Sequence, residues 1–344
     1  MKRRWTESRY WVGAIGPATA SIVVRQYAAL QSDSLTSPVP HVRQIHGGRA
    51  PSKALVRLLM VVLCLIWGST WIVIKGGLRD LPPFTSAGLR FVIAAVVMVG
   101  VAALLSRKEG GAAPPTWLWI VQGTASFAIS YGLVYHAETV LPSGLVSLLW
   151  GVYPMLQALS GQLFLEGERL RPGQWIGFGV ALVGLVLLFR TDLQSFGSEG
   201  VPTALLLLLS PISVVVGTTL VKKHGGGVSS TLLNRNGMFV AAGVLMAAAL
   251  TLERGAPVAW TVPAIGSILY LSLVGTVLTF SLFFWLLRFA PAHQLGLIAY
   301  VTPVIALFLG WAVGSEPITV FTLGGAALIL GGVVLVARRP WSLH

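Results

Sequence analysis

Two prolines inside long apolar runs indicate a first candidate site for binding a solute. Pro154 and Pro303 each remove one helical hydrogen bond and crowd the carbonyl four residues back. Broken backbone inside an apolar medium persists only where protein or a water-filled cavity satisfies it. The sequence therefore predicts a binding cavity beside both kinks; the alternative is a structural kink stabilised by neighbouring helices. The side chains expected to line this cavity are Trp150, Tyr153, Gln157, Tyr300 and Thr302.

Two tryptophans and two hydroxyl side chains form a second candidate lining. Trp67 and Trp71 are four residues apart and share one helical face, with Ser69 and Thr70 between them. Tryptophan near a helix end is an interfacial anchor, but Trp67 lies too deep in its apolar run for that role. We expect the four to give a path flat apolar walls and a few hydroxyls; the alternative is core packing. A later run has a comparable irregular position at Ser210, Pro211 and Ser213.

Two arginines stand inside otherwise uncharged runs. Arg90 lies about six residues, or roughly 9 Å, inside the second expected helix, and Arg235 is its counterpart further along the chain. An arginine buried in an apolar medium costs several kcal/mol unless it faces a partner or water. Both are therefore candidates for attracting an anionic or zwitterionic solute. The alternative is snorkelling, or bonding to carbonyls at the helix end.

His136 and Glu138 are the histidine and acid that stand together close to an apolar run. Histidine titrates in the physiological range, which makes the pair a candidate for proton coupling. The alternative is a solvated loop. The aligned positions later in the chain are Leu287 and Trp285, which do not titrate.

Several motifs of enzymes are missing from the sequence. It holds no GxxxxGK[ST] phosphate loop and no HExxH, and the single cysteine, Cys64, cannot form an intrachain disulfide. No Ser/His/Asp set or pair of intramembrane carboxylates is apparent. We therefore expect a protein that is not an enzyme, has no cofactor and holds no metal.

Composition sets the medium in which these side chains work. Of the 344 residues 55% are hydrophobic and 10% charged, against roughly 25% charged in soluble domains. A soluble globule is excluded, and the lipid bilayer is an expected partner. Residues 1–57 carry +7 of the net charge of +13, and we expect the basic tail, residues 1–53, to be disordered. The remaining basic residues are scattered, so nucleic acid is not expected as a partner.

Ten apolar runs are long enough to cross about 30 Å of hydrocarbon as helices. Short loops after even-numbered runs, with the C-terminus, hold nine Lys and Arg, against four after odd-numbered runs. Because such loops stay in the cytoplasm, we expect a multi-pass protein of the inner (cytoplasmic) membrane with both termini cytoplasmic. The runs are 58–74, 81–106, 110–137, 139–165, 172–189, 200–221, 224–252, 255–287, 289–315 and 317–337.

An internal repeat divides these runs into two sets of five, residues 56–190 and 200–338. An odd number of spans in each copy places the second upside down relative to the first, so we expect inverted repeats. Such repeats give secondary transporters two exchangeable states. The matched spacings are Arg90–Gly110 with Arg235–Gly255, Pro142–Pro154 with Pro291–Pro303, and Glu168–Gly177–Gly184 with Glu316–Gly325–Gly332.

Four segments then form a recognisable pattern. The segments are IWGSTWIVIKGGL (66–78), PPFTSAGLRFVIAA (82–95), LPSGLVSLLWGVYPM (141–155) and APAHQLGLIAYVTPV (290–304). They resemble the ten-helix EamA-type branch of the drug/metabolite transporter superfamily, over residues 56–338. The resemblance implies an all-α integral membrane fold of ten transmembrane helices as two inverted five-helix repeats. It also implies ATP-independent transport of small metabolites by alternating access.

The resemblance favours export over uptake, and we expect the solute to be a neutral or zwitterionic metabolite such as an amino acid. The alternatives are a multidrug exporter and, from another class, a membrane-embedded lipid transferase. Helix 58–74 has no acidic residue, which disfavours exchange of organic cations for protons. Gly177 and Gly184, repeated as Gly325 and Gly332, lie on one helical face and let another helix approach closely. We expect them to join the two halves, in a protein that is a monomer or a homodimer.

Overall fold

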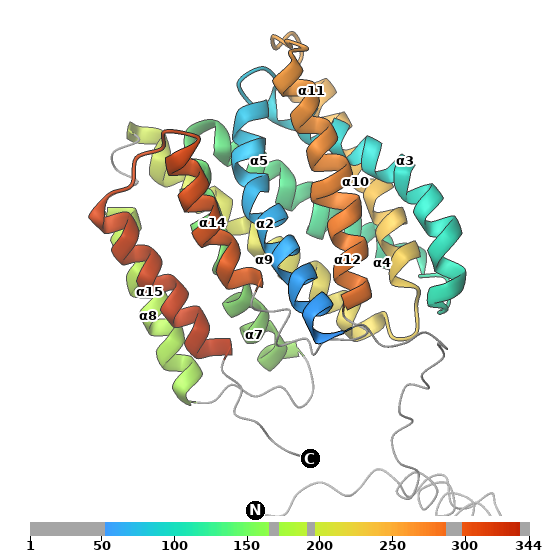
Figure 1. Cartoon of the computed structure of the whole chain (residues 1–344), viewed down its shortest axis with the longest axis horizontal. Helices are drawn as coiled ribbons and strands as arrows, with labels where there is room; N and C mark the ends of the chain where they lie inside the picture. Colours follow the sequence, from blue (N-terminus) through green and yellow to red (C-terminus); the bar gives the residue numbers. More distant parts are fainter. Residues whose placement is uncertain (1–51, 165–171, 191–196, 287–297, 338–344) are drawn as a thin grey trace, which may run out of the picture. The chain divides into compact units, whose positions relative to one another are not determined.

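The regular elements of this chain are helices throughout the residues that the computed structural model describes, 52–164, 172–190, 197–286 and 298–337 (Figure 1). Two of them, η1 and η3, are π-helical stretches between α-helical ones. The basic tail expected at residues 1–53 falls almost wholly outside this part of the chain. The elements are α2 (Lys53–Gly77), α3 (Pro83–Glu109), α4 (Thr116–Val121), η1 (Gln122–Ile129), α5 (Ser130–Val140), α6 (Ser143–Trp150), α7 (Tyr153–Phe164), α8 (Pro172–Arg190), α9 (Gly200–His224), α10 (Ser230–Leu252), α11 (Val262–Leu269), η3 (Tyr270–Leu278), α12 (Thr279–Leu286), α14 (Ile298–Ala312) and α15 (Val320–Ala337).

Hydroxyl side chains and prolines begin many of these helices. Ser52 caps α2 and Ser229 caps α10, each accepting a hydrogen bond from a backbone N–H three residues on. Thr261 caps α11 in the same way. Pro83 begins α3 and Pro172 begins α8, in a first turn where the missing N–H has no helical partner to lose.

Within the described ranges, six helical segments are long and apolar enough to cross a membrane, and three shorter apolar helices accompany them. Many large apolar side chains on their outer faces are exposed, for example Leu104 at 71% and Leu182 at 60%. Such a surface fits an integral membrane protein, because lipid rather than water then meets these side chains. The six segments are Ala54–Gly77, Pro83–Arg107, Thr116–Val140, Gly197–His224, Ser230–Leu252 and Val262–Phe283.

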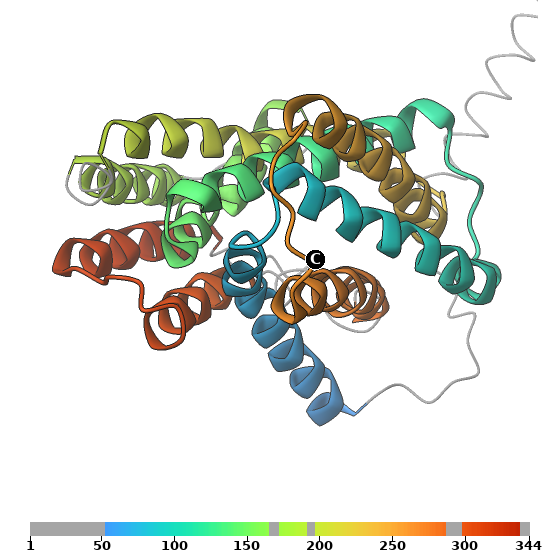
Figure 2. The ribbon, with the colours of Figure 1, turned by 90° about the horizontal axis from the view of Figure 1, so that it is seen from above.

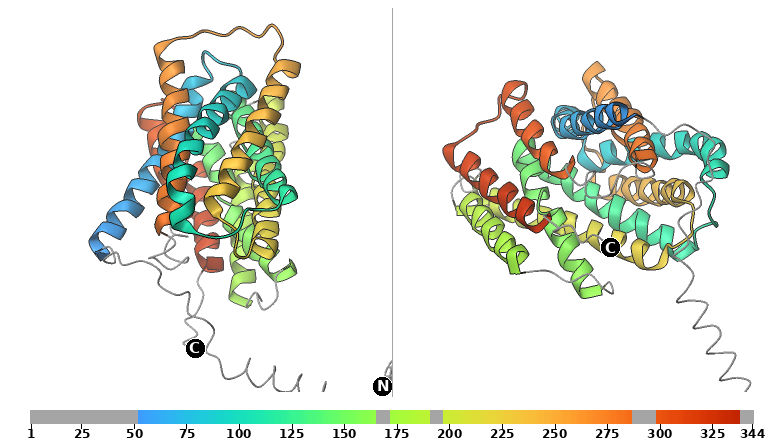
Figure 3. Two further views of the ribbon diagram at one scale, coloured as in Figure 1. Left: turned by 90° about the vertical axis from the view of Figure 1, so that its right-hand side faces the viewer. Right: turned by 60° about the horizontal axis from the view of Figure 1, so that its bottom comes forward.

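The helices α3 and α10 lie side by side and run antiparallel (Figure 3). Glu109, at the end of α3, accepts hydrogen bonds from the backbone N–H groups of Ser230 (3.2 Å) and Thr231 (3.0 Å) at the start of α10. Glu253, at the end of α10, accepts from the N–H of Phe84 and of Thr85 at the start of α3, both at 2.7 Å. Each helix therefore caps the N-terminus of the other.

The helices α8 and α15 form a second antiparallel pair, visible together in Figures 1 and 2. A Cβ added at Gly184 would come within 2.9 Å of the Gly325 carbonyl, and one at Gly332 within 2.5 Å of the Gly177 carbonyl. Glycine at these positions permits the close approach. The prediction that these glycines join the two halves is confirmed.

The helical run around Pro154 is interrupted rather than merely kinked. The expectation of Pro154 in mid-helix is wrong: α6 ends at Trp150, residues 151 and 152 form a turn, and Pro154 is the second residue of α7. This position suits proline, because a residue in the first helical turn needs no N–H partner. Pro303 remains inside α14, and Pro211 inside α9.

The two predicted kinks meet in space. The ring of Pro303 lies 3.5 Å from where a Cβ of Gly151 would stand. The break after α6 therefore packs against the proline of α14, which belongs to the other half of the chain.

Candidate functional site

Four of the predicted lining residues converge at the break after α6. The rings of Trp150 and Tyr153 stack at 5.0 Å, and Trp71 of α2 lies 6.2 Å from Trp150. Trp150 Nε1 donates a 3.0 Å hydrogen bond to Ser210 Oγ of α9, which is next to Pro211. All three aromatic side chains are partly exposed. The site therefore offers aromatic faces and hydroxyl groups, gathered from both halves.

Gln157 extends this cluster by one helical turn. Its side chain is half-buried and accepts a 2.7 Å hydrogen bond from Thr218 Oγ1 of α9. Tyr153 shares a hydrogen bond with the same Thr218. The amide of Gln157 also donates to Thr219 Oγ1 at 3.4 Å. An amide and two hydroxyl groups thus continue the polar side of the cluster along α7 and α9.

The other predicted residues of α2 face a different neighbour. Trp67 packs in an edge or tilted arrangement against Phe280 and Phe283 of α12, at 6.1 and 5.6 Å between ring centroids. Ser69 Oγ lies 2.7 Å from the hydroxyl of Tyr270 in η3. Thr70 is buried and donates to the carbonyl of Trp67. Trp67 therefore has the contacts of the core-packing alternative, whereas Trp71 joins the aromatic cluster.

Arg90 is almost fully buried, at 1% exposure, and its guanidinium is held by neutral groups. Nε donates to Thr276 Oγ1 at 3.0 Å, and the other two nitrogens reach the Tyr135 hydroxyl and the Gly275 carbonyl, both at 3.4 Å. Its central carbon lies 4.6 Å from the ring centroid of Tyr131, a cation–π contact. The snorkelling alternative is wrong for Arg90, because the side chain bonds across to η3 instead of reaching the helix end.

Arg235, the counterpart of Arg90, has a different environment. It is half-buried and donates two hydrogen bonds, at 3.0 and 2.9 Å, to the side chain of its neighbour Asn236. The structure therefore places the two arginines in different surroundings.

Glu138 lies in α5 and is fully buried, at 0% exposure. The alternative of a solvated loop is wrong for this residue. Neither carboxyl oxygen has a hydrogen-bond partner. Among the described residues, the other buried side-chain atoms without a partner are the hydroxyl oxygens of Ser143 and Ser147. His136 is two positions away, about 200° around the helix, so the predicted pair does not face one another.

Lys75 reaches the end of α5 from α2. Its Nζ donates to the backbone carbonyls of Glu138 at 2.5 Å and Leu141 at 3.0 Å. A cation at a helix C-terminus neutralises the partial negative charge of the terminal carbonyls. The next helix, α6, is capped from the other half of the chain, because Glu316 accepts from the N–H of Ser143 (2.7 Å) and Gly144 (3.0 Å).

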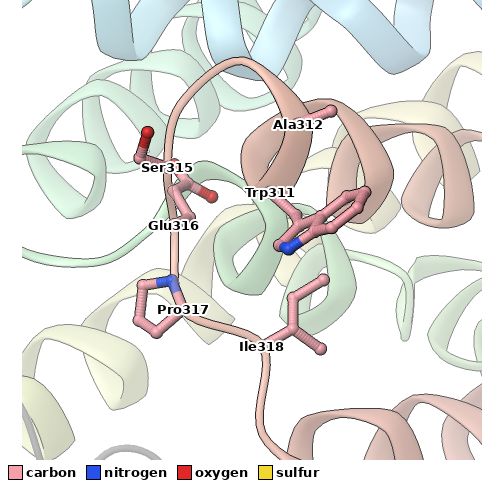
Figure 4. Close-up of a pocket in the computed structure, with 6 residues that line it drawn as sticks. All are labelled: Trp311, Ala312, Ser315, Glu316, Pro317 and Ile318. Carbon is pink, nitrogen blue, oxygen red and sulfur yellow. The ribbon is translucent and has the colours of Figure 1, made fainter.

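The remaining predicted residues lie on α14. Thr302 is half-buried next to Pro303, and the side chain of Tyr300 lies outside the described part of the structure. A pocket of about 590 Å³ opens at the turn between α14 and α15 (Figure 4). Its lining includes Glu316 but none of the residues predicted for the pathway: Trp311, Ala312, Ser315, Glu316, Pro317 and Ile318. The pocket is therefore distinct from the aromatic cluster, and four of the predicted side chains, aromatic and hydroxyl, lie at the cluster.

Sequence reasoning missed several partners in this site. Tyr131, Tyr135 and Glu138 stand at positions i, i+4 and i+7 of one helix face, a spacing that could have grouped them. No pattern in the sequence indicated Thr276 and Thr218, because their hydrogen-bond partners, Arg90 and Gln157, are far away along the chain. Among the described residues no group of three His, Cys, Asp or Glu side chains is placed to hold a metal ion.

Several transporters of known sequence are similar to this chain over most of its length. The chain is 28% identical over 289 residues to the uncharacterized transporter YvbV of Bacillus subtilis, covering 83% of this chain and 93% of that protein. It is 25% identical over 280 residues to the uncharacterized transporter YoaV of the same organism, covering 81% and 96%. The uncharacterized inner membrane transporter YedA of Escherichia coli is 27% identical over 285 residues, covering 80% and 89%.

One solved crystal structure shares the fold, with a TM-score of 0.60 and 21% identity over 84% of this chain and 100% of its own. The profile of the EamA-like transporter family matches residues 55–190 and again residues 201–338. This all-helical membrane protein, with two copies of the repeat, belongs to the EamA-like transporter family.

Proposed function

We propose that this chain is a secondary transporter that exports a small neutral or zwitterionic metabolite, such as an amino acid, by alternating access without ATP. The observation that carries the proposal is the reciprocal contact of equivalent helices. Glu109 caps α10 and Glu253 caps α3, while Gly184 of α8 lies against α15 and Gly332 of α15 lies against α8.

Reciprocal antiparallel contacts are what two inverted copies of one module produce. They support ten transmembrane helices arranged as two inverted five-helix repeats, residues 56–190 and 200–338. Each half can then adopt the conformation of the other, and a site between them opens to alternate sides of the membrane.

The chemistry of the aromatic cluster supports the solute class. Trp71, Trp150 and Tyr153 offer flat apolar surfaces, and Ser210 and Gln157 offer hydroxyl and amide groups. None of the five is charged, which suits a solute with little net charge. Arg90 supplies a fixed positive charge within the protein interior, held by groups of the protein itself. Thr302 and Tyr300 of α14 remain part of the proposed pathway, next to Pro303.

The transport test uses purified protein in proteoliposomes and a panel of labelled solutes: neutral amino acids, an anionic metabolite and a dye cation. We expect saturable accumulation and counterflow of a neutral or zwitterionic member. Accumulation of the dye cation alone would favour a multidrug exporter. Conversion of lipid without accumulation would favour a transferase. Flux with neither saturation nor counterflow would contradict the proposal.

A tryptophan substitution with a matched control tests whether the solute passes the aromatic cluster. Trp150→Phe keeps the aromatic face but loses the bond to Ser210, which is worth about 1 kcal/mol, so we expect transport efficiency to fall about three- to tenfold. Trp311→Phe changes an exposed tryptophan of the peripheral pocket and leaves transport unchanged. Equal effects of the two substitutions would contradict a pathway at the cluster.

The topology test is independent of the solute. Reporters inserted within residues 190–200 and 222–224 fall on opposite sides of the membrane if the repeats are inverted. We also propose that the protein lies in the inner membrane with both termini in the cytoplasm. Reporters found on one side would overturn the inverted arrangement, whatever the solute.

A further inference from the structure

The strongest feature left unused is the carboxyl group of Glu138. It is fully buried and lacks a hydrogen-bond partner on both oxygens. An ionised carboxylate in such a place loses its hydration without compensation, at a cost well above that of a neutral group. The neutral carboxylic acid is the form that fits this conformation.

A cation stands close by but is bound elsewhere. Lys75 Nζ donates to the backbone carbonyl of Glu138 itself and to that of Leu141, and not to the side-chain carboxyl group of Glu138. The ammonium group therefore has two alternative acceptors within one residue: the helix carbonyls and the side-chain carboxyl. A hydrogen bond to an ionised carboxylate is roughly twice as strong as one to a neutral acceptor.

We propose that Glu138 is a proton-binding site, and that its protonation decides whether Lys75 binds the end of α5 or the Glu138 carboxylate. With the proton bound, Lys75 holds the helix carbonyls as the structure shows. When the proton leaves to water, the carboxylate takes the ammonium group and the C-terminus of α5 is released. This inference rests on the proposed transport function, because it names the ion that moves with the solute.

The site reaches the second half of the chain through the turn that follows α5. Only residues 141 and 142 separate α5 from α6, whose N-terminus is capped by Glu316. Glu316 also interacts electrostatically with both Lys75 and Glu138. Release of the end of α5 therefore acts on the contact between the two halves, which is where alternating access requires a change.

The charged and titratable groups around Glu138 are few. The elements packed against α5 are α2, α3, α6, α9 and η1. Neither α6 nor η1 contains a titratable residue, and α9 has none before Lys222 at its other end. The groups that interact electrostatically with Glu138 are Lys75 from α2, Arg90 from α3, Tyr135 on α5 itself and Glu316 from the α14–α15 turn. Further titratable residues on or next to these elements are Tyr131 and His136 on α5 and Glu199 just before α9.

The proton itself is the probe for the first experiment. Infrared difference spectra of the purified protein between about pH 5 and pH 9 report the C=O stretch of neutral carboxyl groups. We expect a neutral-carboxyl band in the wild type that Glu138→Gln removes. Glu253→Gln is the matched control, because that carboxylate is fully hydrogen-bonded at the start of α3, and it should keep the band. A band that survives in Glu138→Gln overturns the proposal, as does a wild type without a band.

Lys75 is tested by a double-substitution cycle on the same signal. Lys75→Met should change the pH at which the neutral-carboxyl band is lost, and the band should be absent from Glu138→Gln with or without Lys75→Met. A band whose pH response is the same in Lys75→Met as in the wild type would overturn the role of Lys75. Thermal unfolding of each variant shows that the comparison is made on folded protein.

A transport arm separates this inference from the proposed function. For the panel solute that the wild type accumulates, Glu138→Gln should abolish accumulation driven by a pH gradient while counterflow persists. Gradient-driven accumulation in Glu138→Gln equal to the wild type overturns the proton site alone. If the wild type accumulates no solute, the proposed function fails, whereas the infrared result still decides the proton site.

Discussion

Arg90 and Arg235 occupy matching positions in the two halves, yet only one of them is built into the interior. Arg90 bonds to Thr276, 186 residues further along the chain, and contacts Tyr131 and Tyr135. Arg235 bonds to the adjacent residue, Asn236. The glutamates and glycines that join the halves show the opposite behaviour, since Glu109 with Glu253, and Gly184 with Gly332, make reciprocal contacts.

The difference shows that the two copies share the contacts between their helices but not the buried titratable side chains. Contacts between equivalent helices must stay alike, because each copy packs against the other. A buried titratable residue has no such constraint: Lys75, Arg90 and Glu138 all belong to the first copy, and Arg90 bonds to Thr276 of the second.

The largest expected effect on stability tests the difference between Arg90 and Arg235. Arg90→Gln removes the partner of Thr276, Tyr135 and the Gly275 carbonyl and leaves a void, so we expect a loss of about 3 kcal/mol of stability. Arg235→Gln should cost about 0.5 kcal/mol or less. Thermal unfolding in detergent measures both, and equal losses would show that the two sites are equivalent after all.

A second effect, of intermediate size, tests the symmetry of the α8–α15 pair. Gly184→Ala and Gly332→Ala place a Cβ against backbone atoms that cannot move aside, so each should cost about 1–3 kcal/mol. Gly179 and Gly331 are the controls, because a Cβ there meets nothing within 4 Å. Alanine at these two positions should be neutral or slightly stabilising. A large loss of stability for only one of Gly184→Ala and Gly332→Ala would contradict the reciprocal contact.

The smallest effect concerns the caps of the α3–α10 pair. Glu109→Gln and Glu253→Gln each replace a charged acceptor at a helix N-terminus, and each should cost about 1 kcal/mol at neutral pH. Thermal unfolding of the two single variants and of the double variant checks this. Costs that differ severalfold would break the equivalence of the two caps.

The cap at Glu109 also has a pH dependence of known sign. Burial alone would raise the pKa of Glu109, but hydrogen bonds from Ser230, Thr231 and Ser229 outweigh it and lower the pKa below its ordinary value of 4.5. Its stabilisation is therefore present above about pH 4.5 and is lost as the pH falls through the lowered value. Unfolding of the wild type and of Glu109→Gln should converge as the pH falls below 4.5, and a constant difference would contradict this assignment.

Much of the framework was predictable from local patterns. The apolar runs give the helices, Pro83 and Pro172 begin two of them, and the spacing of Gly177 with Gly184 indicates a close helix contact. The break near Pro154 was predicted as a kink, but its form as a turn at residues 151 and 152 was not. Proline fixes where a helix must change, whereas the neighbours decide how.

The site was predictable only in part, for a physical reason. Trp71, Trp150 and Tyr153 could be named because large aromatic side chains near a break in a helix are conspicuous. The partners of Arg90 could not, since Tyr135 and Thr276 are 45 and 186 residues away. The burial of Glu138 near a chain turn was equally hidden, because it depends on α2, α3 and α9 packing against the helix that carries it.

The sequence by itself determined a membrane-embedded helical chain of two related halves, with prolines and glycines at fixed places along it. Hydrophobicity and helix geometry are local properties, so they can be read from neighbouring residues. The tertiary structure alone decided which charges are buried and what they bind. Burial and hydrogen bonding depend on side chains that only folding brings together, and so Arg90 and Lys75 gained interior partners while Arg235 kept its neighbour.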